Sequence, residues 1–210
     1  MRVVDLTHEI HSGMPVFPGT PAVRIHTANT LAQHGFEERL LSLSTHTGTH
    51  MDNPSHIMEG RPGLDTLSPE RFMGRGCVLD VRGKSEITRE ELGFWEPVLD
   101  GVDFMLLRTG WEEKWGDATY FSEFPALTEK AARYLTRFNL KGIGVDALSM
   151  DRMEDEHLPV HHILLSKDIL IIENLAHLGA LPQAGFTFMA LPLKIKDGDG
   201  SPVRALATMG

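Results

Sequence analysis

The chain has only one cysteine, Cys77, in 210 residues. It can form no internal disulfide, which is consistent with a reducing compartment, and we expect a cytoplasmic protein. Cys77 lies in the largely apolar run of residues 76–81. We therefore expect a buried, unreactive thiol at this position.

Long apolar segments and basic runs are also absent. Residues 1–5 lack the apolar stretch of a signal peptide, and no window approaches the roughly 18 apolar residues of a membrane-spanning helix. The formal net charge is −9 with no basic cluster to offset it, which argues against nucleic-acid binding. The sequence thus predicts neither a membrane nor a nucleic-acid partner, although bound metal ions could still let an acidic protein bind an anionic substrate.

The remaining composition is that of an ordinary globular protein, with 41% hydrophobic and 23% charged residues. A chain of this length can bury one sizeable core, and neither a repeat nor a low-complexity segment divides it. We expect a single domain over residues 1–210.

Short apolar runs rich in β-branched and aromatic residues recur along the chain. They predict strands at residues 3–6, 23–30, 39–45, 77–81, 104–108, 143–146, 169–172, 186–192 and 203–208. Helix signals are fewer. Proline follows Ser68, Thr88 opens a capping box, Thr128 precedes a run of helical spacing that ends near Asn139, and residues 161–168 suggest a short helix. Because strands and helices alternate in the middle of the chain, the pattern favours an α/β or α+β fold over an all-β fold.

The segment 46–56 holds three histidines and an aspartate, namely His46, His50, Asp52 and His56. In an extended chain His46 and His50 would lie about 13 Å apart at Cα, too far to share one ion. A turn at Gly48 would close this gap, because glycine tolerates the backbone angles that a tight turn needs. An extended chain after the turn would point the side chains of residues 50 and 52 to the same side.

These residue types offer imidazole and carboxylate but no thiolate, which suits zinc or manganese. The alternative is that the histidines only form hydrogen bonds with the local backbone. The density of donors within one short segment favours a metal site over this alternative.

The segment 46–56 resembles the H-x-G-T-H-x-D-x-P-x-H signature of the cyclase family of metal-dependent hydrolases, which includes bacterial kynurenine formamidases and isatin hydrolases. The resemblance extends over nearly the whole chain. Further similar segments are residues 4–7, 14–19, 108–111, 143–146, 159–165, 172–175 and 190–193.

The resemblance implies a swivelling β/β/α architecture with a central mixed sheet or barrel in one domain. It also implies hydrolysis of an amide, most directly of N-formyl-L-kynurenine to L-kynurenine and formate in tryptophan breakdown. Another aryl or cyclic amide such as isatin is an alternative substrate, and a non-catalytic metal-binding module is a rival of another class. Related enzymes form dimers, so a homodimer or higher homo-oligomer is expected.

By the same resemblance two divalent cations, zinc or alternatively manganese, are bound by His46, His50, Asp52, His161 and Glu173, with the two acids bridging both ions. His161 is selected over His162 by its place in the family pattern. From the residues alone, Glu173 follows an apolar strand, where it either meets a positive group or simply emerges into solvent.

Two further expectations concern the surroundings of this site. The resemblance makes His56 the general acid and base, and an imidazole suits proton transfer near neutral pH, although metal ligation is an alternative role. Phe17 is the candidate for contact with an aryl substrate, or else a core residue. The family position is usually tryptophan in kynurenine formamidases, so Phe17 is a departure from that pattern.

Other aromatic and histidine residues have weaker assignments. Trp111 and Trp115 either line the substrate pocket or pack in the core, and we expect His157 and His177 at the surface. The loop 196–202 contains aspartates and glycines like part of a calcium loop, but its ligand series stops too early, so we expect a solvated hairpin turn.

Overall fold

Seven strands close into a mixed barrel in the computed structural model, which describes all 210 residues. Their order around the barrel is β12-β11-β5-β7-β9-β10-β4, and β4 pairs again with β12. The bounds are β4 (His50–Asp52), β5 (Met73–Asp80), β7 (Phe104–Arg108), β9 (Gly142–Val145), β10 (Leu170–Glu173), β11 (Ala184–Pro192) and β12 (Gly200–Met209). The predicted α/β fold with a central barrel is therefore confirmed.

The barrel combines parallel and antiparallel pairs. Neighbours in the series β5, β7, β9 and β10 are parallel, and every other pair is antiparallel. β1 (Arg2–Asp5) pairs with the C-terminal half of β12, on the same edge that β4 occupies further along. β12 therefore closes the barrel only because its first three residues reach β4.

Alternate residues of the barrel strands pack into two different apolar clusters. In β5, Cys77 and Leu79 belong to the cluster shared with the helices, whereas Val78 belongs to a second cluster that draws residues from every barrel strand except β9. Since side chains alternate along a strand, the first cluster lies outside the barrel and the second fills its interior. Burial on both faces explains why these strands read as continuous apolar runs.

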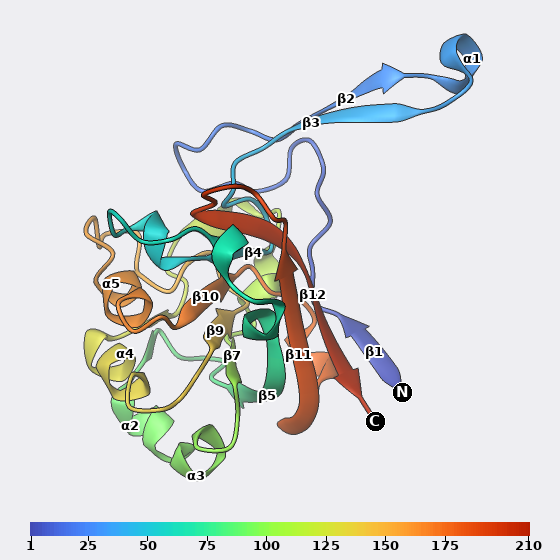
Figure 1. Cartoon of the computed structure of the whole chain (residues 1–210). Helices are drawn as coiled ribbons and strands as arrows, with labels where there is room; N and C mark the ends of the chain where they lie inside the picture. The colour runs from blue at the N-terminus through green and yellow to red at the C-terminus, as the bar shows by residue number, and fades with distance from the viewer.

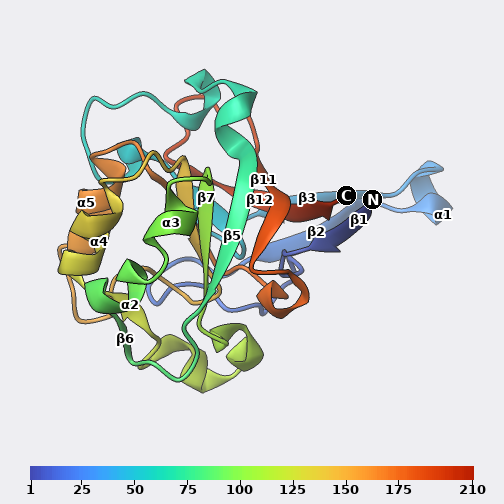
Figure 2. The same cartoon turned by 90° about the horizontal axis from the view of Figure 1, so that it is seen from below.

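The longer helices cover one side of the barrel, and α2, α4 and α5 lie together there in both views (Figure 1, Figure 2). The α-helices are α1 (Leu31–His34), α2 (Arg89–Gly93), α3 (Glu96–Leu99), α4 (Glu129–Leu135) and α5 (Pro159–Leu165). The predicted capping box is present at α2, where Thr88 accepts from the backbone of Glu91 and Glu91 accepts from the backbone of Thr88. Thr128 caps α4 as predicted, but this helix ends at Leu135 rather than near Asn139.

A hairpin arm extends away from the barrel (Figure 1). It consists of β2 (Arg24–Asn29) and β3 (Glu38–Ser42), which pair antiparallel, with α1 at the tip. A short parallel pair, β6 (Glu86–Ile87) with β8 (Ala126–Leu127), lies beside the helices. No helix of the structure has the length and apolar character required to cross a membrane.

The nine predicted strands are all present, and the largest error is at β5, which begins at Met73 rather than at residue 77. The same error affects the helix predicted from Ser68. Only one 3-10 turn, Pro69–Phe72, forms there, because the following residues pair with β11 instead. The other 3-10 turns are Pro54–His56, Leu64–Thr66, Trp111–Lys114, Ala118–Phe121 and Leu178–Ala180. β4 was not predicted, since three residues are too few for a periodic signal.

Candidate metal centre

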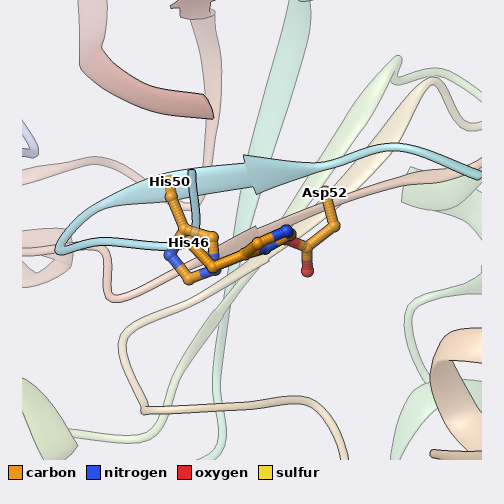
Figure 3. A group of neighbouring side chains, drawn as sticks. All are labelled: His46, His50 and Asp52. Atoms are coloured by element: carbon orange, nitrogen blue, oxygen red, sulfur yellow. The ribbon is translucent and has the colours of Figure 1, made fainter. Parts of the chain in front are cut away.

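A glycine turn joins His46 to β4. Gly48 has a φ of +62°, and a Cβ at this position would lie 2.9 Å from the Cε atom of Met14. The left-handed φ favours glycine, and the turn predicted at this residue is confirmed. The side chains of His46, His50 and Asp52 lie together on one side of β4, as Figure 3 shows. The expected common orientation of residues 50 and 52 is therefore present.

The carboxylate of Asp52 lies at the centre of the histidines. Its Oδ1 atom is 2.6 Å from His46 Nδ1 and 3.3 Å from His50 Nε2, and its Oδ2 atom is 3.3 Å from His161 Nε2. Asp52 is 1% exposed. A buried carboxylate without positive partners would cost several kcal/mol, so the surrounding imidazoles, or a cation among them, are necessary.

Glu173 contacts two of the same imidazoles from β10, which pairs with β4. Its Oε2 atom is 3.5 Å from His50 Nε2, and its Oε1 atom is 3.3 Å from His161 Nε2. The side chain is held by the backbone N–H of Met150, which donates to Oε1 at 2.9 Å. Glu173 is 5% exposed, so it does not emerge into solvent.

These distances suit ligands of a shared ion. Two atoms that each lie about 2.05 Å from a tetrahedral metal are about 3.3 Å apart. The Nε2 atoms of His50 and His161 lie 3.3 to 3.5 Å from oxygens of Asp52 and Glu173. That separation is long for a charge-assisted hydrogen bond but close to the ligand–ligand distance. The imidazole and carboxylate donor set therefore fits a divalent metal.

In each of the three histidines His46, His50 and His161, the ring nitrogen that points away from the Asp52 and Glu173 carboxylates (the outer nitrogen) has its own acceptor. His50 Nδ1 donates to the carbonyl of Gly48 at 2.8 Å, His161 Nδ1 lies 2.6 Å from Asp151, and His46 Nε2 lies 2.9 Å from Asp199. Metal-binding histidines commonly have such a partner, which fixes the ring and leaves the opposite nitrogen free to bind the ion. All three rings thus present one nitrogen to the centre.

The two adjacent histidines of α5 face opposite environments. His161 is 3% exposed, and its backbone N–H and that of Val160 both donate to the buried carboxylate of Asp151. His162 is exposed. Of these two histidines, only His161 is therefore close enough to Asp52 and Glu173 to share an ion with them.

The pKa shifts reflect the close packing of acids and imidazoles. Burial alone would raise the pKa of Asp52, but the charge of His50 and hydrogen bonds from His161 and His46 hold it well below its usual range. Burial alone would lower the pKa of His46, but the hydrogen bond and charge of Asp52, with Asp199, raise it to about 9. The raised pKa favours the protonated form of His46, so a metal that binds there would compete with a proton.

His56 lies beside this cluster on the Pro54–His56 turn. Its ring centroid is 3.9 Å from that of His46 and 6.4 Å from that of His161, and its Nδ1 atom is 3.5 Å from Asp199. Burial is the main reason that its pKa is lowered, partly offset by the charge of Asp52. A neutral imidazole at this position can accept a proton. Since His46, His56 and Asp199 also form a group able to hold an ion, ligation by His56 stays an alternative.

A cavity of about 260 Å³ opens over these side chains. Beyond the histidines and acids, ten further residues line it. These are Pro15, Val16, Phe17, Thr20, Ser44, Gly48, Leu148, Ser149, Leu158 and Asn174. Phe17 is 40% exposed at this cavity, so the alternative of a core phenylalanine is wrong.

The other aromatic residues considered from the sequence pack away from the cavity. Trp111 donates through Nε1 to the carbonyl of Tyr120, and Trp115 stacks on His8 with ring centroids 3.9 Å apart. Neither tryptophan lines the cavity. His157 and His177 are exposed, as expected. Cys77 is fully buried, as predicted, and burial raises the pKa of its thiol to about 12.

Sequence reasoning missed three polar residues around the centre. Asp199 was expected in a solvated turn, but its carboxylate contacts His46, because β12 returns to pair with β4 immediately after it. No feature of the sequence around Asp151 indicates a role at this centre. Asn174 follows Glu173 with a φ of +55° and donates to the carbonyl of Gly48. The only sequence hint was its place directly after a strand-end glutamate.

Comparison with known proteins gives a consistent result. Residues 4–152 match the family model described as putative cyclase. The chain is 32% identical to a kynurenine formamidase of Bacillus cereus over 97% of this chain and 95% of that protein. It is 33% identical to a kynurenine formamidase of Geobacillus thermodenitrificans, over 99% and 98%.

Solved structures agree in fold. Isatin hydrolase A from Labrenzia aggregata superposes with a TM-score of 0.90 at 30% identity, covering 99% of this chain and 93% of that one. A predicted metal-dependent hydrolase from Bacillus stearothermophilus gives a TM-score of 0.81 at 32% identity, covering 98% and 97%.

Proposed function

Because the chain belongs to the cyclase family of metal-dependent hydrolases, we propose that it is an arylformamidase that cleaves N-formyl-L-kynurenine to L-kynurenine and formate. The observation that carries this proposal is a set of facing imidazoles and carboxylates at the base of a cavity whose lining includes Phe17, with one further imidazole beside it. The full-length similarity to kynurenine formamidases supports the choice of substrate.

We assign two divalent cations, zinc or alternatively manganese, to this centre. His46 and His50 would hold one ion, His161 would hold the other, and Asp52 and Glu173 would bridge them. The bridging role is supported by the way each acid directs one oxygen toward His50 and the other toward His161. When bound, a divalent metal supplies a nucleophilic water near neutral pH and polarises the carbonyl of the amide.

Residues of the chain carry out proton transfer, orient the substrate and exclude water. His56 accepts a proton as the nucleophile attacks the formyl carbon, and then donates it to the nitrogen, so that the amine can leave. Phe17 packs against the aryl ring of the substrate and orients the amide over the centre. Leu148 and Leu158 of the cavity wall exclude water from the rest of the site.

A second candidate substrate is a cyclic aryl amide such as isatin. Neither lysine nor arginine lines the cavity, although N-formylkynurenine carries an α-carboxylate that a cation would bind well. Phe17 stands where kynurenine formamidases usually have tryptophan, and this difference also favours the second candidate substrate. Isatin itself has no carboxylate to bind.

The test is turnover of N-formylkynurenine and of isatin, followed by absorbance, with the wild type and His56→Ala. We expect the wild type to prefer N-formylkynurenine and the variant to lose at least about 100-fold in kcat. His162→Ala is the matched control, since this neighbouring histidine is exposed on α5 and should leave kcat unchanged. Preference for isatin would establish the second candidate. Hydrolysis unaffected by His56→Ala would refute the catalytic assignment.

We also propose that the protein forms a homodimer through the hairpin arm. Four apolar side chains on the arm and its tip are half exposed or more, namely Leu31, Phe36, Leu40 and Leu41. No residue from Arg24 to Ser42 is buried, and an isolated hairpin is only marginally stable in water. A second copy of the chain would cover these side chains.

Sedimentation of the double variant Leu40→Glu/Leu41→Glu tests the dimer. We expect the wild type to sediment as a dimer and the variant as a monomer. Phe94→Glu is the control, because Phe94 is 87% exposed but lies far along the chain from the arm. A monomeric wild type would contradict the proposal.

A further inference from the structure

Asp199 occupies a fixed position between the metal-binding segment and the start of β12. Three hydrogen bonds hold its loop against residues 53–65. Asn53 N–H donates to the Asp199 carbonyl at 3.0 Å, Leu64 N–H donates to the Gly198 carbonyl at 2.9 Å, and Asp197 N–H donates to Asp65 at 3.0 Å. The Asp199 carboxylate therefore projects from a loop that these hydrogen bonds hold in place.

One oxygen of this carboxylate faces two histidines. Asp199 Oδ2 is 2.9 Å from His46 Nε2 and 3.5 Å from His56 Nδ1. The two rings are themselves close, with centroids 3.9 Å apart. The first distance is a hydrogen bond and the second an ion-pair distance, and no other acceptor contacts either of these nitrogen atoms. Asp199 is thus the acceptor available to both.

The other two outer acceptors differ from Asp199. The Gly48 carbonyl accepts from His50 and from the amide of Asn174, and from no other histidine. Asp151 is fully buried and serves His161 together with the first turn of α5. Only Asp199 joins a proposed ligand to the proposed acid and base.

We propose that Asp199 is a positioning residue that orients His46 and His56 together, so that the ligand and the proton-transfer group are held as one unit. The proposal rests on the hydrolase function proposed above. A carboxylate that accepts from His46 Nε2 leaves Nδ1, on the side of Asp52, to bind the ion. The same carboxylate, 3.5 Å from His56 Nδ1, favours by its charge a proton on that nitrogen and leaves Nε2 to exchange a proton with the substrate.

The first experiment measures metal affinity by competition with a chromophoric chelator, independently of activity. We expect Asp199→Ala to bind Zn²⁺ about 10 to 100-fold more weakly than the wild type, with Asp199→Asn between them. Asp197→Asn is the control, because this residue lies in the same loop, is exposed, and has a φ of +56° that asparagine tolerates. Wild-type affinity in a folded Asp199→Ala would overturn the His46 half of the proposal.

The second experiment is a double-mutant cycle with His56, measured as kcat at saturating metal. We expect Asp199→Ala to lower kcat about 100-fold in the wild type but less than about threefold in His56→Ala, since the effect passes through His56. Equal losses of kcat in both backgrounds would show that Asp199 acts independently of His56 and would overturn the His56 half of the proposal.

A third measurement separates failure of the proposal from failure of the proposed function. The ¹⁵N chemical shifts of the His56 ring report which nitrogen carries the proton. We expect Asp199→Ala to shift His56 from mainly Nδ1-protonated to a mixture, whether or not the protein hydrolyses any amide. Unchanged shifts would overturn the orientation of His56 by Asp199, even in an active enzyme.

Discussion

Gly200 lies directly against the imidazole of His46. A Cβ on Gly200 would stand 2.6 Å from His46 Cε1 and 2.9 Å from the carbonyl oxygen of Met51. Gly200 is the first residue of β12 and the partner of Asp52 in the β12–β4 pairing. The strand that closes the barrel can therefore approach residues 46–52 only because this position has no side chain.

We predict that Gly200→Ala displaces His46 and weakens binding of Zn²⁺ by at least about tenfold. Overpacking should also cost about 1–3 kcal/mol of stability. Chelator competition and urea denaturation measure the two effects. Gly93→Ala is the matched control, because nothing lies within 4 Å of a Cβ there. Unchanged metal affinity in Gly200→Ala would mean that His46 adjusts without loss.

A second prediction concerns the hydroxyl of Tyr120, which donates to Asn174 Oδ1 at 2.6 Å in a buried position. Asn174 in turn donates to the carbonyl of Gly48, so Tyr120→Phe should loosen the turn as well as leave a buried amide oxygen unpaired. We expect a loss of about 1–3 kcal/mol in urea denaturation, with weaker metal binding. Tyr134→Phe, whose hydroxyl donates to Glu96, should leave metal affinity unchanged. Equal metal affinities in both variants would contradict a link from Tyr120 to the turn.

The third prediction is a loss of stability in acid caused by His8. Burial, and then the charge of His177, lower the pKa of His8 to about 4, and its Nε2 atom has no hydrogen-bond partner. Between pH 6.5 and 4 the unfolded chain binds a proton that the folded chain does not, so stability falls as the pH falls through this window. We expect the wild type to lose about 2 kcal/mol more than His8→Phe between pH 7.5 and 5.0. Parallel pH profiles of the two proteins in urea denaturation would disprove the assignment.

The fourth prediction concerns removal of metal. In the structure the acids and imidazoles of the centre already pair with one another, so we expect the chelated protein to stay folded but to melt at a lower temperature. Restoring Zn²⁺ at 100 times its dissociation constant should add about 2.7 kcal/mol of stability. His161→Ala should lose most of this gain, whereas His162→Ala should keep it. A melting temperature that does not respond to any divalent cation would exclude a metal centre.

Much of the local structure could be predicted from the residues. Thr88 with Glu91, and Thr128, mark helix starts because a cap depends only on the residues of one turn. The strand over Phe104–Arg108 was predicted with its correct ends, because an unbroken apolar run is typical of a strand buried on both faces. β4 and the true start of β5 could not be predicted, since both depend on pairing with strands distant in the sequence.

In the candidate site, too, local features could be predicted from the sequence and long-range contacts could not. By itself, the sequence determined the turn at Gly48 and the grouping of His46, His50 and Asp52, because a bend and two-residue alternation operate within a few residues. The tertiary structure alone decided that Asp199 contacts His46 and that Asp151 supports His161. The contact of Asp199 with His46 depends on β4 lying between β10 and β12, and the free energy of such long-range pairing comes from packing that no short segment contains. The contact of Asp151 with His161 depends on the first turn of α5 folding back onto a residue ten positions earlier.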